Sequence, residues 1–548
     1  MPPQGSDSIG DESVTQTLAS GDIRQTGNES GPPSRGKVVM LVDNGVEGDS
    51  RVQKEARSAA AAGWDVTLIG LMTRGSQEQR WTIGGAEVQL YGIRAHLREH
   101  KSTLRRSLRR PLAYSPGQKT AAYRLQQVRA RRVELVTNFG ALAAAKQAGE
   151  PSWKLAMRRA ALVPSQALLK VEKKWASLRR SEMRKLQAAR GDENSLLTRI
   201  PIKFWQLTRG ERAWRQLDPA LWDFEIALGG VIDELEPDII HANDYRMIGL
   251  AARAKLRAAA RGKTVQVVWD AHEFVPGMSD RPGNPRWLPA QVAHEREFGK
   301  YADAVVTVSP RLAEWLQRDH GLAELPTVVL NCPDVMDRPE PNERLRKDCG
   351  VGPDTPLLGY CGGINSVRGV DLIVEAMPYL PDVHLALVSL HPNGNRQTAE
   401  PIEELAERLG VTDRVHLLPY VAPDDVVSYL SGADAAVTPL RHLPNHEIAL
   451  SNKFFEYSQA RLPLITSDVK AMAQMVRSTG QGEVYDADDV QDYVRAVKKV
   501  LADPAKYRAA YEKAGVLDQW NWQSQADHLL AVYSRLAPSV SSPSTSRS

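Results

Sequence analysis

The sequence contains little cysteine and no long apolar run, and these two absences exclude several classes of protein. Only three cysteines occur in 548 residues, Cys332, Cys349 and Cys361. Their number is odd and their spacing pairs none of them, so neither a disulfide framework nor a zinc site is expected. No stretch approaches the ~18 apolar residues that a membrane span requires. We therefore expect a cytoplasmic protein that meets a membrane, if at all, only at its inner surface.

Two terminal segments are poor in apolar side chains. Residues 1–35 are rich in Ser, Gly, Asp and Thr and lack the apolar core of a signal peptide. Residues 536–548 are rich in Ser. Both are expected to be disordered tails, because they bury too little apolar surface to offset the entropy lost on ordering. The chain as a whole is 42% hydrophobic and 25% charged, which is ordinary for a globular protein of two or more domains.

Two series of short apolar runs rich in β-branched residues predict an α/β fold with two Rossmann-like domains facing a cleft. The first series lies in residues 36–335 and ends in a plausible hinge at Asn331–Asp334, and the second lies in residues 336–518. Residues 519–535 are expected to form a C-terminal helix that packs back on the first domain. The predicted strands are 38–42, 66–69, 237–241, 265–269, 304–308 and 328–330, then 357–361, 383–388, 415–418, 435–438 and 464–466.

A strongly basic segment interrupts the first domain. Residues 91–210 hold about 27 Lys and Arg against about 7 Asp and Glu, a local balance near +20 in a chain whose net charge is +4. We interpret this segment as an inserted helical subdomain. It is either a solvated helical hairpin, a surface that docks on anionic membrane, or a site for an acidic polymer. No nucleic-acid partner is expected, because no nucleic-acid-reading motif appears.

Polar residues after the predicted strands of the first domain are candidates for a site, because ligands bind at the carboxyl ends of parallel strands. Gly45, Gly48 and Asp49 lie in the first loop, where glycines let a phosphate or an acceptor approach the backbone. His272 follows the strand 265–269 and is a candidate to contact a sugar. The alternatives are a plain turn for the loop and a structural role for the histidine. His241–Asp244 is a second strand end of this kind.

The second domain offers a candidate anion site. Gly362, Gly363 and Arg368 follow its first strand and precede a helix, and a guanidinium can hold phosphate in a fork. Further on, Ser451 and Asn452 are plausible helix caps that place Lys453 in a first turn, with Glu456 one turn later as an acceptor for ribose hydroxyls. The alternative is a capped amphipathic helix with a solvated Lys-Glu pair. Asp486 and Asp488 match a D-x-D metal pattern, which we attribute to the start of a helix.

In their order along the chain these residues resemble the GT-B glycosyltransferases of family 4, which are retaining enzymes. The resemblance covers about residues 36–90 and 215–535 and does not cover the basic segment. The stretches that carry it are Asp49–Ala56, Pro237–Asp244, Asp270–Glu273, Ala302–Ser309, Asn331–Asp334, Tyr360–Gly363, Arg368–Asp371, Gly432–Asp434 and Asn452–Tyr457.

The resemblance implies a role for each candidate. Glu456 would bind the ribose of a nucleotide sugar, and Arg368 with Lys453 would bind its diphosphate. His272 would touch the transferred sugar, and no cofactor or catalytic metal would be needed. The family often places a basic residue where Gly363 stands here. It also often has two glutamates seven residues apart, but Ile448 occupies the first position, so Glu447, or Asn445 with His446, would take that part.

The expected function is therefore transfer of a sugar from a nucleotide sugar to a glycan or lipid-linked acceptor, as in building a polysaccharide precursor, without a metal and with retention. Three alternatives remain open. The same architecture serves nucleotide-sugar epimerases and sugar phosphorylases, and an idle scaffold could act only through its basic segment. The base, the sugar and the acceptor are not specified by the sequence, nor is the oligomeric state.

Overall fold

The computed structural model describes residues 34–72, 79–93, 114, 120–184, 199–278, 286–334, 342–390, 399–422, 424–448, 450–513 and 515–536. The predicted tails, residues 1–35 and 536–548, lie outside the described residues except for their innermost positions. The same holds for most of residues 94–119 in the basic segment.

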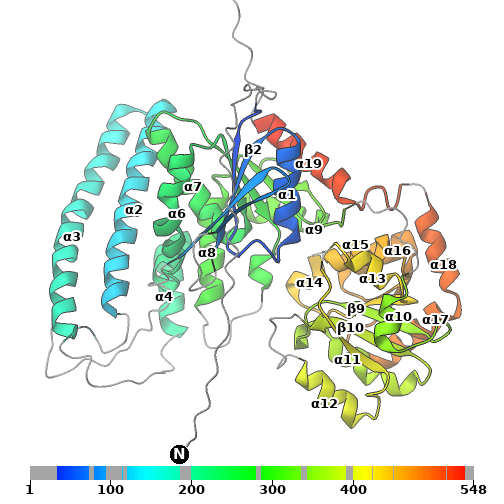
Figure 1. The fold of residues 1–548 in the computed structure, drawn as a ribbon. Helices are drawn as coiled ribbons and strands as arrows, with labels where there is room; N and C mark the ends of the chain where they lie inside the picture. Colours follow the sequence, from blue (N-terminus) through cyan, green and yellow to red (C-terminus); the bar gives the residue numbers. More distant parts are fainter. Residues whose placement is uncertain are drawn as a thin grey trace, which may run out of the picture. The chain divides into compact units, whose positions relative to one another are not determined.

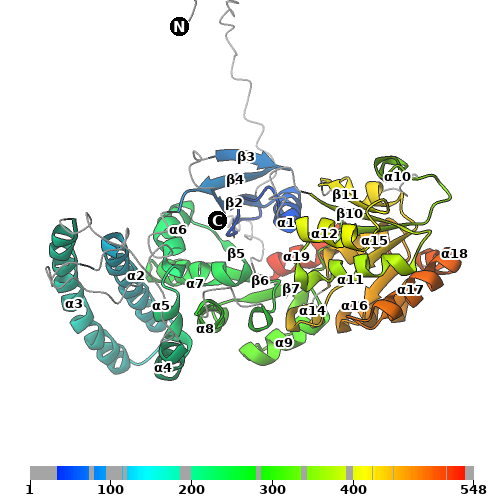
Figure 2. The ribbon, with the colours of Figure 1, turned by 90° about the horizontal axis from the view of Figure 1, so that it is seen from below.

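The first sheet has eight strands in the order β3-β4-β2-β1-β5-β6-β7-β8. In Figure 2 the labelled strands β3, β4, β2, β5, β6 and β7 follow one another in this order. Its neighbours are parallel except for β3 and β4, which form an antiparallel edge hairpin that the sequence analysis did not anticipate. The strands are β1 (Lys37–Leu41), β2 (Asp65–Leu71), β3 (Gln79–Ile83), β4 (Ala86–Tyr91), β5 (Ile239–Asn243), β6 (Gln266–Ala271), β7 (Ala304–Thr307) and β8 (Thr327–Val328).

Both faces of this sheet are covered, which explains why its strands are continuously apolar. Val39 and Leu41 of β1 join one core with α6, α7 and α8, whereas Val38 and Met40 join another with α1 and α19 (Figure 1). The alternation follows from the two-residue period of a strand. The helices are α1 (Ser50–Ala61), α5 (Trp214–Leu217), α6 (Leu221–Leu235), α7 (Asp244–Ala260), α8 (Trp287–Gly299), α9 (Pro310–His320) and α19 (Trp522–Leu536).

Most of the described part of the basic segment is helical. It contains α2 (Thr120–Gln147), α3 (Ser152–Arg184) and α4 (Arg199–Arg209). Helix α2 packs against α6 and α7 of the first domain and against α3 on its other side (Figure 1). Gly140 permits the close approach to α7, because a Cβ atom there would lie 2.7 Å from the carbonyl oxygen of Leu256. The hairpin is therefore attached to the first domain through α2.

The second sheet is parallel throughout, with the order β11-β10-β9-β12-β13-β14. Separate cores cover its two faces. The predicted fold of two α/β domains is thereby confirmed. Its strands are β9 (Leu357–Cys361), β10 (His384–Leu390), β11 (Val415–Pro419), β12 (Ala435–Thr438), β13 (Leu464–Ser467) and β14 (Gly482–Tyr485). Its helices are α10 (Arg344–Cys349), α11 (Val370–Glu375), α12 (Glu400–Arg408), α13 (Val426–Leu430), α14 (Pro444–Ile448), α15 (Asn452–Gln459), α16 (Lys470–Thr479), α17 (Val490–Ala502) and α18 (Pro504–Arg508).

The chain passes between the two sheets beside Cys332 and returns before α19. The carbonyl oxygen of Cys332 accepts a hydrogen bond from Lys54 Nζ, and the backbone N–H of Trp522 donates to the carbonyl oxygen of Pro333 at 2.7 Å. Helix α19 then packs on α1 and β8 of the first domain, where Tyr533 is fully buried. The two crossing segments are thus tied to each other and to the first domain.

Candidate functional site

Arg368 is held in a tight turn after β9. The side chain of Asn365 accepts a hydrogen bond from the backbone N–H of Arg368 at 3.1 Å. A Cβ atom at Gly362 would lie 3.3 Å from Nη1 of Arg368, so glycine leaves room for the guanidinium. Gly369 has φ +66°, and a Cβ atom there would lie 2.0 Å from the carbonyl oxygen of Pro439, which follows β12. The turn places Arg368 beside the carboxyl ends of β9 and β12.

Helix α15 presents Lys453 and Glu456 at the same end of β9. The hydroxyl of Ser451 caps the helix by accepting from the N–H of Lys453 at 3.3 Å, as predicted. Lys453 Nζ lies 2.8 Å from Glu456 Oε2, and the amide of Asn452 donates to Glu456 Oε1 at 3.3 Å. The N–H of Cys361 donates to the hydroxyl of Tyr457 at 2.8 Å and so ties β9 to α15.

The electrostatics keep positive charge at this position. Burial would lower the pKa of Lys453, but the carboxylate of Glu456 outweighs it and raises that pKa. Burial raises the pKa of Tyr360, against the opposing effect of the Arg368 guanidinium beside it. Two cations thus flank the end of β9 with one carboxylate next to them. This set can bind an anion between the cations and hydroxyl groups on Glu456.

Glu447 lies in α14 and has a partner for each carboxylate oxygen. Its Oε1 lies 2.5 Å from His442 Nδ1, and its Oε2 accepts from the backbone N–H of Lys470 at the start of α16 at 3.0 Å. Burial alone would raise its pKa, but His442 and the Lys470 N–H lower it. Nearby, the side-chain oxygen of Asn445 accepts from the N–H of Phe274 in the first domain at 3.1 Å. Glu447 is therefore an ionised group that orients α14 and α16.

The loop after β1 lines a cavity of about 620 Å³. The carboxylate of Asp49 caps α1 by accepting from the N–H of Val52 at 3.3 Å, and its other oxygen accepts from the amide of Asn44 at 2.9 Å. Gly45 and Gly48 also line the cavity. Both oxygens of the Asp49 carboxylate are already hydrogen-bonded within the loop and to α1. The lining residues are Asn44, Gly45, Glu47, Gly48, Asp49, Met72, Gln79 and Leu90.

His272 lies at the carboxyl end of β6 and is one quarter exposed. Its Nδ1 is 3.7 Å from Asp270 Oδ2. Burial would lower the pKa of His272, but Asp270 and Asp244 raise it to about 10. The pKa of Asp244 is raised to about 7, chiefly by burial. These two carboxylates therefore favour the protonated form of His272.

A buried ionic network behind this strand end was missed by sequence reasoning. Arg51 of α1 holds the carboxylate of Asp270 with two hydrogen bonds of 2.7 and 3.0 Å and lies 3.1 Å from Glu55. His241 Nε2 is 3.7 Å from Glu55, and its Nδ1 is 2.5 Å from the hydroxyl of Tyr533 in α19. These five side chains are at most 4% exposed. His241, at the second strand end with polar residues, is fully buried beneath α19 and does not line a crevice.

Among the residues that the structure describes, two clusters of acidic and histidine side chains have the spacing to hold a metal ion. In the first, Glu55, His241 and Asp270, the Arg51 guanidinium already supplies the positive charge. The second joins His442, Asp468 and Asp486 at the surface. The D-x-D residue Asp488 pairs with Arg441 at 2.7 Å, just before the Asp489 cap of α17.

No helix in the described part of the chain is long and apolar enough to cross a bilayer.

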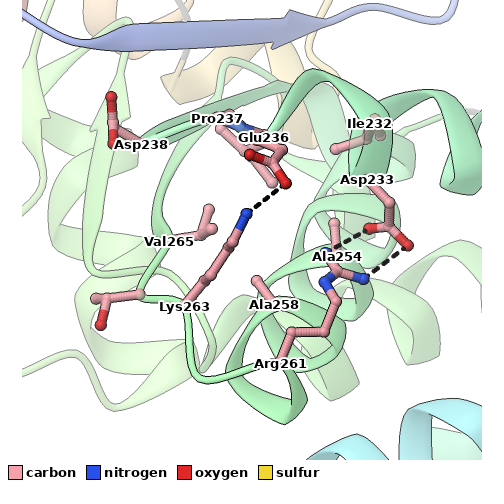
Figure 3. A pocket seen from close by; sticks show the side chains of 12 residues that line it. Ile232, Asp233, Glu236, Pro237, Asp238, Ala254, Ala258, Arg261, Lys263 and Val265 are labelled. Carbon is pink, nitrogen blue, oxygen red and sulfur yellow. Dashed lines mark hydrogen bonds and ion pairs between the residues drawn. The ribbon is translucent and has the colours of Figure 1, made fainter.

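A separate cavity of about 320 Å³ lies at the opposite end of the first sheet. Figure 3 shows two ion pairs among its lining residues, Lys263 with Glu236 and Arg261 with Asp233. It opens at the amino ends of β5 and β6, next to Asp238 and Val265. Because its charges are paired and ligands of such sheets bind at the other end, we assign it no part in the site.

Comparisons with known proteins agree with this architecture. The family model "Glycosyltransferase Family 4" matches residues 184–335, and "Glycosyl transferases group 1" matches residues 341–516. D-inositol 3-phosphate glycosyltransferase of Geodermatophilus obscurus is 28% identical over 326 residues, which cover 56% of this chain and 68% of that protein. The GDP-mannose-dependent alpha-(1-6)-phosphatidylinositol monomannoside mannosyltransferase of Mycolicibacterium smegmatis is 26% identical over 313 residues. These residues cover 54% of this chain and 78% of that protein.

The fold is similar to a solved structure over nearly the whole chain. Sucrose-phosphate synthase from Thermosynechococcus elongatus matches with a TM-score of 0.59 at 16% identity, covering 91% of this chain and 99% of that one. Likeness at this identity concerns the fold, whereas the two family models match both domains in sequence. The chain therefore belongs to the GT-B glycosyltransferases, with a family 4 N-terminal domain and a group 1 C-terminal domain.

Proposed function

We propose that this glycosyltransferase takes its sugar from a nucleotide-sugar donor held at the end of β9. The observation that carries the proposal is the gathering of Arg368, Lys453 and Glu456 around one strand end. The guanidinium and the ammonium suit a diphosphate, with the capped N-terminus of α15 adding partial positive charge. Glu456 suits the two hydroxyls of a ribose. Gly362, Gly363 and Asn452 complete the donor site.

The chemical step would use fixed charges in place of a metal ion. The leaving diphosphate gains negative charge as the glycosidic bond breaks, and preorganised cations stabilise that charge. We propose retention of configuration, with attack on the same face that the diphosphate leaves. His272 would contact the transferred sugar as a cationic hydrogen-bond donor, and Glu447 would position α14 near it. The cavity beside Gly45 and Gly48 would receive the acceptor.

The acceptor is proposed to be a glycan or a lipid-linked precursor, handled in the cytoplasm. Support for a lipid comes from the relative whose name includes phosphatidylinositol monomannoside. The cavity after β1 is lined by Asn44, Glu47 and Gln79, side chains that hydrogen-bond hydroxyl groups. An acceptor rich in hydroxyls suits this lining.

A donor screen tests the proposal. Thermal shift with UDP, GDP, ADP and TDP and their sugars should identify one nucleoside diphosphate that stabilises the protein. Lys453→Ala should abolish most of that response. Glu512→Gln, a change in an exposed glutamate paired with Arg461, serves as the control and should leave the response intact. If Lys453→Ala responds like the unaltered protein, Lys453 is not in the site.

Product analysis separates the proposed reaction from its alternatives. A transferase releases nucleoside diphosphate faster when acceptor is added, and chelator should not change this rate. An epimerase would convert the donor sugar without acceptor, and a phosphorylase would require inorganic phosphate. An idle scaffold would do none of these.

A further inference from the structure

Helix α3 carries an exposed row of large apolar side chains along one face. The spacings within the row are three, four or eleven residues, each close to a whole number of turns, so its members line up. They are between 48% and 66% exposed. We call this row the apolar stripe, and it consists of Trp153, Met157, Leu168, Val171, Trp175 and Leu178.

The apolar stripe is not the face that holds the hairpin together. Leu155, Leu162, Leu169 and Ala176 recur every seven residues, and these four are partly or fully buried. An ion pair between Arg131 of α2 and Glu172 of α3 joins the helices on that side. In both Figure 1 and Figure 2, α3 lies on the outer side of α2, away from α6 and α7. The helix therefore has a second apolar face in solvent.

Positive charge borders the apolar stripe. The sequence of α3 contains nine Lys and Arg against two Glu. Lys154 and Lys174 are exposed next to the two tryptophans, and Lys170 and Lys173 are exposed in the same stretch. Close to Trp175, a cleft of about 280 Å³ between α2 and α3 is lined by three arginines, Arg124, Arg131 and Arg179.

This combination favours a lipid surface over other partners. An apolar face with tryptophans, bordered by Lys and Arg, is the pattern of a helix that lies in the plane of a membrane interface. A second copy of the chain would bring two basic faces together, which like charges oppose. A nucleic acid would leave the apolar stripe in water. The charge is complementary to anionic headgroups, which attract each nearby Lys or Arg.

We propose that α3 docks on bilayers containing anionic lipid, with the apolar stripe in the boundary between headgroups and acyl chains. This deepens the proposed function, because a lipid-linked acceptor would be met at that surface. Docking does not require an occupied donor site. Binding to vesicles and the thermal response to nucleoside diphosphate are therefore independent readouts, and failure of one is distinguishable from failure of the other.

Vesicle co-sedimentation of the full chain tests the proposal. Vesicles of phosphatidylcholine are compared with an equimolar mixture of phosphatidylcholine and phosphatidylglycerol. The unaltered protein should bind the anionic vesicles at least about tenfold more tightly, and less so at high salt. The triple variant Trp153→Ser, Val171→Ser, Trp175→Ser should lose at least about tenfold in binding. A second variant, Lys170→Glu with Lys173→Glu and Lys174→Glu, should lose a similar factor.

Matched controls complete the experiment. Leu325→Ser and Tyr379→Ser remove apolar side chains that are 53% and 51% exposed elsewhere on the protein, and they should leave vesicle binding unchanged. The proposal is overturned if the unaltered protein ignores anionic vesicles, or if both α3 variants bind as it does. It is also overturned if light scattering shows a dimer that the triple serine variant converts to a monomer, since the apolar stripe would then be a contact between copies.

Discussion

The guanidinium of Arg51 and the carboxylate of Asp270 form a bidentate ion pair in the interior of the first domain, between helix α1 and the end of strand β6. Nε lies 2.7 Å from Oδ2 and Nη2 lies 3.0 Å from Oδ1, and the two side chains are 4% and 0% exposed. Burial alone would raise the pKa of Asp270, but Arg51 holds it below its ordinary value. Asp270 in turn raises the pKa of His272. Asp270, which Arg51 holds in place, thus favours the protonated form of a candidate site residue.

Breaking this pair should destabilise the protein strongly. Asp270→Asn removes the carboxylate that holds the buried Arg51 guanidinium with two hydrogen bonds and leaves the 3.1 Å contact with Glu55 as its remaining ion pair. The free energy of unfolding should fall by about 3–5 kcal/mol. Denaturant titration followed by tryptophan fluorescence measures the change. The control is Arg57→Ala, which removes a 2.7 Å pair with Asp334 whose side chains are 43% and 44% exposed. That change should cost less than about 1 kcal/mol. Equal losses in the two variants would contradict the importance of burial.

Two glycines with the same backbone angle test the turn that holds Arg368. Gly369 and Gly410 both have φ +66°. A Cβ atom at Gly369 would lie 2.0 Å from the Pro439 carbonyl oxygen, whereas a Cβ atom at Gly410 would have no neighbouring atom within 4 Å. Gly410→Ala should therefore cost only the strain of the angle, about 1 kcal/mol. Gly369→Ala should cost more, and it should weaken nucleoside-diphosphate binding by about tenfold or more by displacing Arg368. Calorimetric titration would refute this if both variants bound equally.

The buried histidine His241 should make the protein sensitive to acid. Burial lowers its pKa to about 4, below the ordinary value near 6.5. Between about pH 4 and pH 6.5 the unfolded chain therefore binds a proton on this histidine that the folded protein does not bind. Stability is fully present above about pH 6.5 and is lost as the pH falls toward 4, by up to roughly 3 kcal/mol.

The comparison with His241→Asn isolates this effect, because the unaltered protein and the variant share the same groups around residue 241, namely Glu55, Asp270 and Tyr533. Urea titrations at pH 7, 6 and 5 should give a smaller loss of stability in the variant. Parallel pH profiles for the two proteins would show that His241 does not titrate as proposed.

Local patterns predicted much of the fold. The expected strand at 357–361 coincides with β9, and the expected strand at 304–308 contains β7. The edge hairpin of β3 and β4 was missed, because its alternating polar residues resemble a surface loop. β14 was missed too, since a four-residue strand beginning with glycine carries little signal. The predicted strand at 328–330 is shorter in the structure, where β8 spans Thr327–Val328.

The candidate donor residues could be proposed from the sequence because each lies next to a strongly patterned element. Arg368 follows a buried strand, and Lys453 follows the cap residue Ser451. The contact of Glu447 with Lys470 could not be foreseen, because it arises only through the packing of α14 on α16.

The order of apolar runs, turn residues and helix caps along the chain determined the two-domain architecture and the candidate donor residues, because these signals act between near neighbours. Only the tertiary structure decided which charged groups are buried. Arg51 meets Asp270 across 219 residues, and Tyr533 meets His241 across 292. Whether a polar side chain faces solvent or a buried partner depends on which distant segments cover it, and no local pattern records that.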